Sequence, residues 1–186
     1  MATTDPSAKS NAEHGQTADT APAGKQAQQS MSIIVTKGSL DWAYPPFILA
    51  TTAAAMDVRV SLFFTFYGLQ LLKKRLDHLR VTTLGNPAME MPMMGGHMSM
   101  PNLISALPGT DRMATKMMCN LISKKGVSSV AELREAAQEM DVRMIGCQMT
   151  LDLFELKQDE LIDGIEIAGA ATYMETALQS DINLFV

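Results

Sequence analysis

Apolar and polar positions follow one another in a way that predicts alternating strands and helices from residue 32 onward. Short apolar runs rich in β-branched residues predict strands at residues 32–37, 58–65, 141–147, 163–169 and 182–186. Helical spacing fills the intervals at residues 41–56, 69–79, 111–126, 129–140, 148 onward and 170–179. The second run becomes continuously apolar towards its end, which is typical of a central parallel strand. The pattern therefore predicts one α/β domain with a doubly wound, mainly parallel five-stranded sheet and helices on both faces.

Two segments depart from this alternation. Residues 1–30 contain almost no large apolar side chains, so burial cannot offset the entropy of ordering them, and we expect a disordered tail. Residues 85–109 form a long loop in the expected fold, and long loops are usually lids, binding segments or interfaces. This insertion is rich in Gly and Pro and carries six methionines: Met89, Met91, Met93, Met94, Met98 and Met100. The α/β domain is expected to span residues 31–186.

Composition excludes several classes of protein. The chain has 186 residues, of which 47% are hydrophobic, and a net charge of -5, so one core is expected and nucleic acid is not an expected partner. Two cysteines are too few for a disulfide scaffold, and no arginine-rich leader with an apolar run is present, which favours the cytoplasm. Asp57 and Arg59 interrupt the apolar stretch at residues 42–66, so we expect two elements there rather than a membrane span.

Cys147 is the first candidate for chemistry, because it ends an expected strand and precedes a helix. Ligands gather beyond the carboxyl ends of such strands, where we expect Gly38, Gly68, Cys147 and Gly169 to converge. The amides and dipole of the following helix favour an anion, so the pKa of the thiol should be low and the sulfur a partly exposed nucleophile. Gly146 would let a substrate or partner approach the sulfur. The alternative is that Cys147 is a small buried hydrophobic residue.

Other thiol and cofactor chemistries fit less well. Acyl transfer of the Cys–His kind needs a nearby histidine, and only His97 is a candidate. A dinucleotide site needs three glycines, whereas Gly38 stands alone after the first strand, and no cofactor is expected. Sulfur relay needs one nucleophilic thiol and can use a second. Cys119 is the second thiol of the chain, with the alternative that it only packs among methionines.

The methionine-rich insertion has two interpretations. Its flexible, polarizable side chains are suited to cover an oligomer interface, a membrane-facing patch or a pocket for a partner, which is the favoured interpretation. The alternative is a Cu(I) site, because thioether and imidazole groups are soft ligands. Its ligands would be His97, Met98 and Met100.

Four segments together carry a family resemblance: Ile33-Ile34-Val35-Thr36-Lys37-Gly38, Leu62-Phe63-Phe64-Thr65-Phe66-Tyr67-Gly68, Gly146-Cys147-Gln148-Met149-Thr150 and Gly164-Ile165-Glu166-Ile167-Ala168-Gly169-Ala170-Ala171-Thr172-Tyr173. With them, residues 31–186 resemble the DsrE/DsrF-like sulfur-carrier family, in the branch found beside TusA-like carriers and rhodaneses in sulfur-oxidising prokaryotes. The resemblance implies a flavodoxin-like sheet and transfer of thiosulfate-derived or other sulfane sulfur through a persulfide on Cys147, with Cys119 as second thiol.

The same resemblance gives further expectations for the site and the partners. A TusA-like carrier and a rhodanese-type protein are the implied partners, and a trimer, tetramer or hexamer is the implied assembly. The pocket around the thiol is expected to include Lys37, Gly38, Tyr67, Gly68, Gly146 and Met149. The protein would act as a sulfurtransferase or persulfide carrier. The alternative is a non-catalytic interaction module or membrane-associated scaffold of the same fold, on which no sulfur adduct would form.

Overall fold

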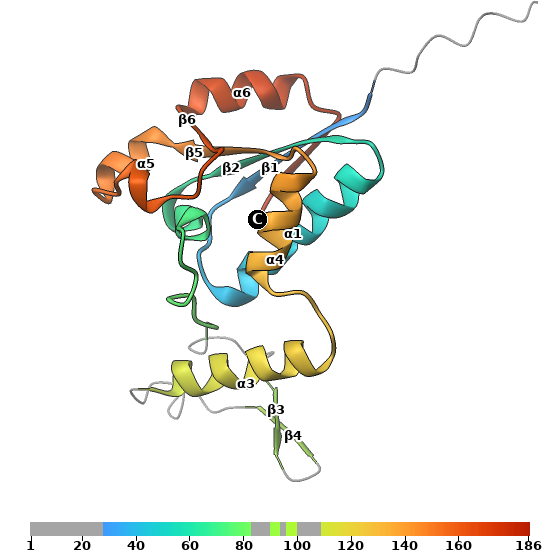
Figure 1. Cartoon of the computed structure of the whole chain (residues 1–186), viewed down its shortest axis with the longest axis vertical. Coiled ribbons are helices and arrows are strands. Elements are labelled where there is room, and N and C mark those ends of the chain that lie inside the picture. The colour runs from blue at the N-terminus through green and yellow to red at the C-terminus, as the bar shows by residue number, and fades with distance from the viewer. Residues whose placement is uncertain (1–27, 83–89, 94–95, 100–108) are drawn as a thin grey trace, which may run out of the picture.

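A five-stranded parallel sheet forms the centre of the protein (Figure 1). The computed structural model describes residues 28–82, 90–93, 96–99 and 109–186. The strands lie in the spatial order β6-β5-β2-β1-β7, and every neighbouring pair is parallel. Their bounds are β1 Ser30–Val35, β2 Arg59–Phe64, β5 Arg143–Cys147, β6 Glu166–Ala168 and β7 Ile182–Phe185. The predicted parallel five-stranded α/β sheet is confirmed.

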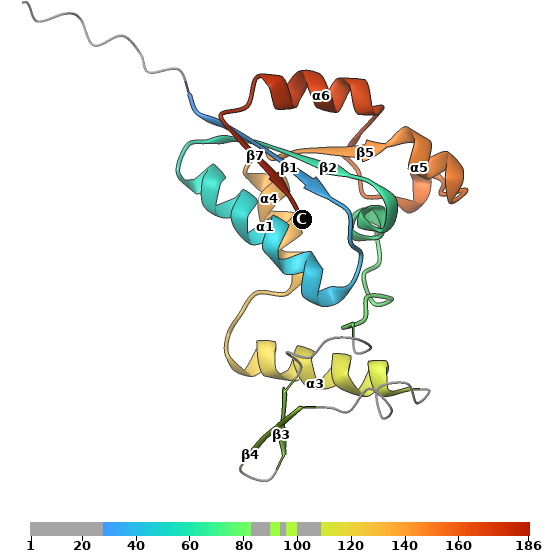
Figure 2. The ribbon, with the colours of Figure 1, turned by 180° about the vertical axis from the view of Figure 1, so that it is seen from behind.

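Helices cover both faces of this sheet (Figures 1 and 2). Helices α1 (Leu40–Ala55) and α4 (Val130–Glu139) lie on one face, and α6 (Ala170–Leu178) lies on the other. Helix α5 (Gln148–Leu153) follows the carboxyl end of β5 directly. Helix α3 (Thr110–Lys124) lies away from the sheet, beyond α1 and α4. The chain thus builds β1, β2, β5 and β6 outward and then returns through α6 to place β7 beside β1, which makes the sheet doubly wound.

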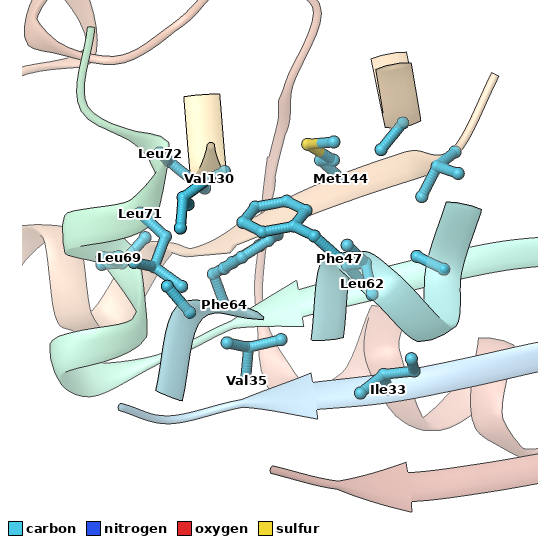
Figure 3. Close-up of a cluster of buried hydrophobic side chains, with 14 of the residues drawn as sticks. Ile33, Val35, Phe47, Leu62, Phe64, Leu69, Leu71, Leu72, Val130 and Met144 are labelled. Atoms are coloured by element: carbon cyan, nitrogen blue, oxygen red, sulfur yellow. The ribbon is translucent and has the colours of Figure 1, made fainter. Parts of the chain in front are cut away.

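The largest apolar cluster fills the space between the sheet and the α1/α4 layer (Figure 3). Ile33 and Val35 of β1, with Leu62 and Phe64 of β2, are fully buried there because alternate strand residues point to the same face. Phe47 of α1 packs on them, with its ring centroid 6.0 Å from that of Phe64. Each such side chain contributes about 1.5–3 kcal/mol through burial. The cluster fixes the carboxyl ends of β1 and β2, and therefore the turns that follow them.

Residues 69–79 do not form the α-helix that their spacing predicts. A 3-10 helix, η1 (Phe66–Leu72), stands there instead. It cannot continue, because its last carbonyls have partners from distant elements. The guanidinium of Arg134 donates to the carbonyls of Leu71 at 2.8 Å and Lys73 at 2.7 Å, and the amide of Ile162 donates to Leu72 at 2.9 Å. Tertiary hydrogen bonds therefore override the helical spacing.

The expected loop at residues 85–109 contains a short antiparallel pair, β3 (Glu90–Met93) and β4 (Gly96–Ser99), so the prediction of a loop without secondary structure is wrong for these residues. Residues 85–89, 94–95 and 100–108 of this insertion lie outside the described residues, as do residues 1–27 of the predicted tail. Residues 28–30 belong to the fold, because β1 begins at Ser30 and pairs there with Arg59.

The apolar stretch at residues 42–66 is divided between α1 and β2, as expected. The division falls at Asp57, which adopts a left-handed conformation with φ of 62°. Within the part of the chain that the structure describes, no helix combines the length and the apolar character needed to cross a membrane.

Candidate functional site

Cys147 is the last residue of β5 and immediately precedes α5. Alternation along β5 directs Cys147 and Ile145 to the face covered by α6, where they pack with Phe63 and Tyr173. The rings of Phe63 and Tyr173 stack with centroids 4.8 Å apart and close this small cluster. Cys147 is consequently only 3% exposed. The prediction of a partly exposed thiol is wrong for the isolated chain, because α6 and the strand side chains enclose the sulfur.

One side of this enclosure is polar. Thr150 is the third residue of α5 and is completely buried. Its Oγ1 lies 3.1 Å from Oγ1 of Thr65, the residue that follows β2, and accepts a hydrogen bond from the amide of Phe66 at 3.3 Å. Hydrogen bonding from these hydroxyls lowers the pKa of the Cys147 thiol. The thiol is therefore held between an apolar wall and a pair of hydroxyl groups.

These contacts decide the ionisation of the thiol. Burial is the largest single influence and raises the pKa of Cys147, but hydrogen bonds from the hydroxyl and amide of Thr150, the hydroxyl of Thr65 and the amide of Met149 together outweigh it. The pKa of Cys147 lies below its ordinary value as a result. Hydrogen-bond donors stabilise the anion more than the neutral thiol, which is why they lower the pKa. The chain can therefore hold a thiolate at this position.

Three of the expected pocket residues, Lys37, Gly38 and Tyr67, line one cavity of about 450 Å³ at the carboxyl ends of β1 and β2. Trp42 forms another wall, with the ammonium of Lys37 3.0 Å from the centroid of its ring. Gly38 is needed because a Cβ there would lie 2.2 Å from the carbonyl oxygen of Tyr67. This pocket does not include Cys147 in its lining. The segment from Thr65 to Tyr67 connects the two.

An exposed aromatic cluster lies along this connection. Phe66 adopts φ of 47°, which is rare for a bulky residue, and its ring meets Phe154 edge-on at 6.4 Å. Tyr67 stacks on the same Phe154 ring at 5.7 Å. Met149, another expected pocket residue, is 65% exposed at the start of α5. Exposed apolar side chains therefore lie around the helix that follows the thiol.

The two remaining glycines of the expected pocket have packing roles. A Cβ at Gly68 would lie 2.1 Å from the carbonyl oxygen of Val35, so Gly68 allows η1 to lie against the end of β1. Gly146 is buried, and a Cβ there would meet side-chain atoms of Leu69 at 3.3 Å and Ile167 at 3.1 Å. The expectation that Gly146 opens a path to the sulfur is wrong. The space beside Gly146 is filled by core side chains, on the face of β5 opposite to the one that carries the sulfur of Cys147.

Cys119 is not brought together with Cys147. It is exposed on α3 and lines a separate cavity of about 480 Å³ with Tyr44 and Val130. Both thiols are free. The structure describes no side chains for the alternative copper ligands His97 and Met98, and Met100 lies outside the described residues. No group of three or more His, Cys, Asp and Glu side chains in the described segments is placed to hold a metal ion.

Sequence reasoning missed Thr65 and Thr150 as site residues. Thr150 follows Cys147 by three positions, and this spacing places the two side chains in the same first turn of a helix. That signal is readable once the strand–helix junction is located. Thr65 gives no local signal, because it reaches the sulfur only through the pairing of β2 with β5.

Comparison with known proteins supports the resemblance seen in the sequence. The model of the DsrE/DsrF/DrsH-like family matches residues 27–185. A sulfur carrier protein, DsrE2 of Allochromatium vinosum, is 58% identical over 159 residues, which cover 86% of this chain and 99% of that protein. The uncharacterized protein YrkE of Bacillus subtilis is 34% identical over 157 residues, covering 83% of this chain and 95% of its own. The crystal structure of YchN from E. coli aligns over 86% of this chain and 100% of its own, with 13% identity and a TM-score of 0.47. The chain belongs to the DsrE/DsrF/DrsH-like family.

Proposed function

We propose that the protein is a sulfur carrier that accepts sulfane sulfur as a persulfide on Cys147 and passes it to a partner protein. The observation that carries this proposal is the thiol at the junction of β5 and α5, whose pKa is lowered by hydrogen bonds to its anion. A thiolate is the reactive form of cysteine in sulfur exchange. The name of the 58% identical relative, a sulfur carrier protein, supports the same role.

The transfer needs no oxidant or reductant. The thiolate of Cys147 attacks the outer sulfur of a donor persulfide, R–S–SH, and forms a new S–S bond. The S–S bond of the donor breaks, and its inner sulfur leaves with the electron pair as R–S⁻. The outer sulfur keeps its proton or exchanges it with water, so Cys147 becomes Cys–S–SH. Delivery to an acceptor thiolate is the same displacement in the opposite direction.

The surface around α5 favours a protein as the partner. Phe66 is 47% exposed, Tyr67 63% and Leu153 60%, in addition to Met149. Exposed apolar groups of this kind are typical of interaction sites. Because the sulfur itself is buried, a partner has to displace part of α5 or the Phe66 segment to reach it. A TusA-like carrier or a rhodanese-type protein is the partner we propose.

The second thiol, Cys119, has a different environment from Cys147. Cys119 is exposed, so it can receive sulfur only by a route separate from the enclosed Cys147. We propose that Cys147 is the first thiol to accept sulfur and that Cys119 has a secondary role.

A homo-oligomer is proposed because large apolar side chains remain exposed on α6 and β7, where Leu178 is 81% and Phe185 72% exposed.

Intact-mass spectrometry tests the assignment. The native wild-type protein and the Cys147→Ser and Cys119→Ser variants are incubated with a persulfide donor. The wild type and Cys119→Ser should gain about 32 Da per sulfur, whereas Cys147→Ser should lose the adduct. Equal loading of Cys147→Ser and the wild type would refute the assignment. A native protein that binds partners but gains no sulfur would favour the interaction module of the same fold.

A further inference from the structure

We propose that Thr150 and Thr65 form a hydroxyl pair that positions and stabilises the anionic sulfur of Cys147, with Thr150 donating to the sulfur and Thr65 orienting Thr150. This deepens the proposed function, on which it rests only in taking the Cys147 thiolate as the reacting group. Thr150 is fully buried, and the two threonines come from elements 85 residues apart. The register of β2 with β5 pairs Phe64 with Gly146 and therefore places Thr65 beside Cys147, while Thr150 lies in the first turn of α5 after the same cysteine.

The direction of the hydrogen bonds follows from the capacity of a hydroxyl group, which has one proton and two lone pairs. One lone pair of the Thr150 oxygen accepts the amide of Phe66. The thiolate can only accept. If Thr65 donates to the second lone pair across the 3.1 Å contact, the proton of Thr150 is left for the sulfur. This order uses every hydrogen-bonding position of the completely buried Thr150 hydroxyl, as buried polar groups require.

The same two hydroxyls can also hydrogen bond with the neutral thiol if the direction of the hydrogen bonds is reversed. An S–H group can donate, so Thr150 can accept from the sulfur and give its own proton to Thr65. The pair therefore follows the protonation of Cys147 without any movement of heavy atoms. In the described part of the chain, no buried side-chain nitrogen or oxygen is left without a partner, which agrees with a fully used network.

The backbone of Phe66 adopts an unfavourable conformation to donate its amide to Thr150. Its φ of 47° is a backbone conformation that bulky residues rarely adopt, and it directs the amide at Thr150. Strained residues of this kind cluster at functional sites. The ring of Phe66 is 47% exposed, so burial of the side chain does not account for the conformation.

Charged groups do not provide the stabilisation. The influences on the pKa of Cys147 are burial and hydrogen bonds, and none comes from a charged side chain. The ionisable groups on the elements around the sulfur are engaged elsewhere or point to the surface: Arg143 of β5 pairs with Glu166 of β6, Asp152 of α5 accepts from Gln148, Tyr173 of α6 contacts Ser32, and Lys37 lies over Trp42. The hydroxyl pair is therefore the side-chain feature that distinguishes this thiol.

The experiment is a pH titration of thiolate ultraviolet absorbance in the Cys119→Ser protein, with Cys147→Ser added as the blank. Thr150→Val keeps the shape of the side chain and removes the hydroxyl, whereas Thr150→Ser keeps the hydroxyl. We expect Thr150→Val to lower the thiolate fraction near neutral pH about tenfold or more, as the loss of a hydrogen bond to a charged group predicts. Thr150→Ser should retain the wild-type midpoint, and Thr65→Val should raise it by a smaller amount.

An unchanged midpoint in folded Thr150→Val would overturn the inference. If Thr150→Val does not fold, the titration of Thr65→Val is the test. An unchanged thiolate midpoint in Thr65→Val would then overturn the inference. Sulfur loading of the same proteins separates the two proposals. Loading of the wild type with unshifted midpoints in the variants leaves the carrier function standing and removes the hydroxyl pair. Shifted midpoints without loading of the wild type leave the pair standing and remove the carrier function.

Discussion

Gly68→Ala is expected to destabilise the fold severely, because the new methyl group has no room. A Cβ at this position would lie 2.1 Å from the carbonyl oxygen of Val35 and 2.8 Å from its carbonyl carbon. Both atoms belong to the backbone of β1, which cannot rotate away as a side chain can. Separation would also strain two hydrogen bonds of 3.0 Å, from the amide of Thr65 to Val35 and from the amide of Gly68 to Thr36.

The expected magnitude follows from these contacts. Forcing an extra methyl group into a packed site costs about 1–3 kcal/mol. Two weakened hydrogen bonds add about 1 kcal/mol each. The free energy of unfolding should therefore fall by about 3–5 kcal/mol, which is a large part of the roughly 5–15 kcal/mol available to a domain.

Urea unfolding followed by far-ultraviolet circular dichroism measures the effect, with two glycines as matched controls. Gly146→Ala would meet the flexible ends of Ile167, Leu69 and Leu151, and should cost about 1 kcal/mol while leaving sulfur loading unchanged. Gly169→Ala meets nothing within 4 Å, so its effect should be smaller still. If Gly68→Ala were no more destabilising than Gly146→Ala, backbone contact would not be the reason for glycine at this position.

Three further changes test other parts of the structure. Arg134→Met leaves the carbonyls of Leu71 and Lys73 without their donor and should cost about 3 kcal/mol in urea unfolding, and a loss below about 1 kcal/mol would contradict this role. The amide and hydroxyl of Ser129 lower the pKa of Glu132, so its contribution to stability is present above the unfolded pKa and is lost as pH falls through the lower folded value. Glu132→Gln should lack this dependence when urea midpoints are compared across acidic pH. Lys37→Met should change the fluorescence of Trp42 and cost at most about 1 kcal/mol, and an unchanged emission spectrum would speak against the cation–π contact.

The sheet could be predicted from the sequence because each strand has a local signal. The apolar run ending at Phe64 and the strand–helix junction at Cys147 are both readable without tertiary information. The helix predicted at residues 69–79 is wrong because distant residues, not the local sequence, determine the structure there. Helical spacing is present there, but the donors that end η1 come from Arg134 and Ile162, far along the chain. Local pattern cannot report such partners.

The candidate site divides in the same way. The position of Cys147 at a strand–helix junction is local, and so are Thr150 and the amide of Met149, which help to lower its pKa. Its burial does not, because Tyr173 closes the cluster from α6 and stacks on Phe63 of β2. The hydroxyl of Thr65 likewise arrives through sheet pairing. Site features that depend on a single strand–helix junction could be predicted from the sequence. Features that depend on contacts between distant strands and helices could not.

The two sides of the enclosure around Cys147 differ in how firmly they are held, and this indicates where a partner enters. On the α6 side, the stacked ring of Tyr173 is tied by its hydroxyl to Ser32 of β1 at 3.2 Å, within a buried contact. On the α5 side, the cover is a helix of only six residues with an exposed apolar surface. A helix of six residues has less stability of its own than the nine-residue α6, and local opening begins at the least stable element. Amides of α5 should therefore exchange with solvent faster than those of α6, and partner docking on the α5 side would couple exposure of the sulfur to the arrival of the protein that exchanges it.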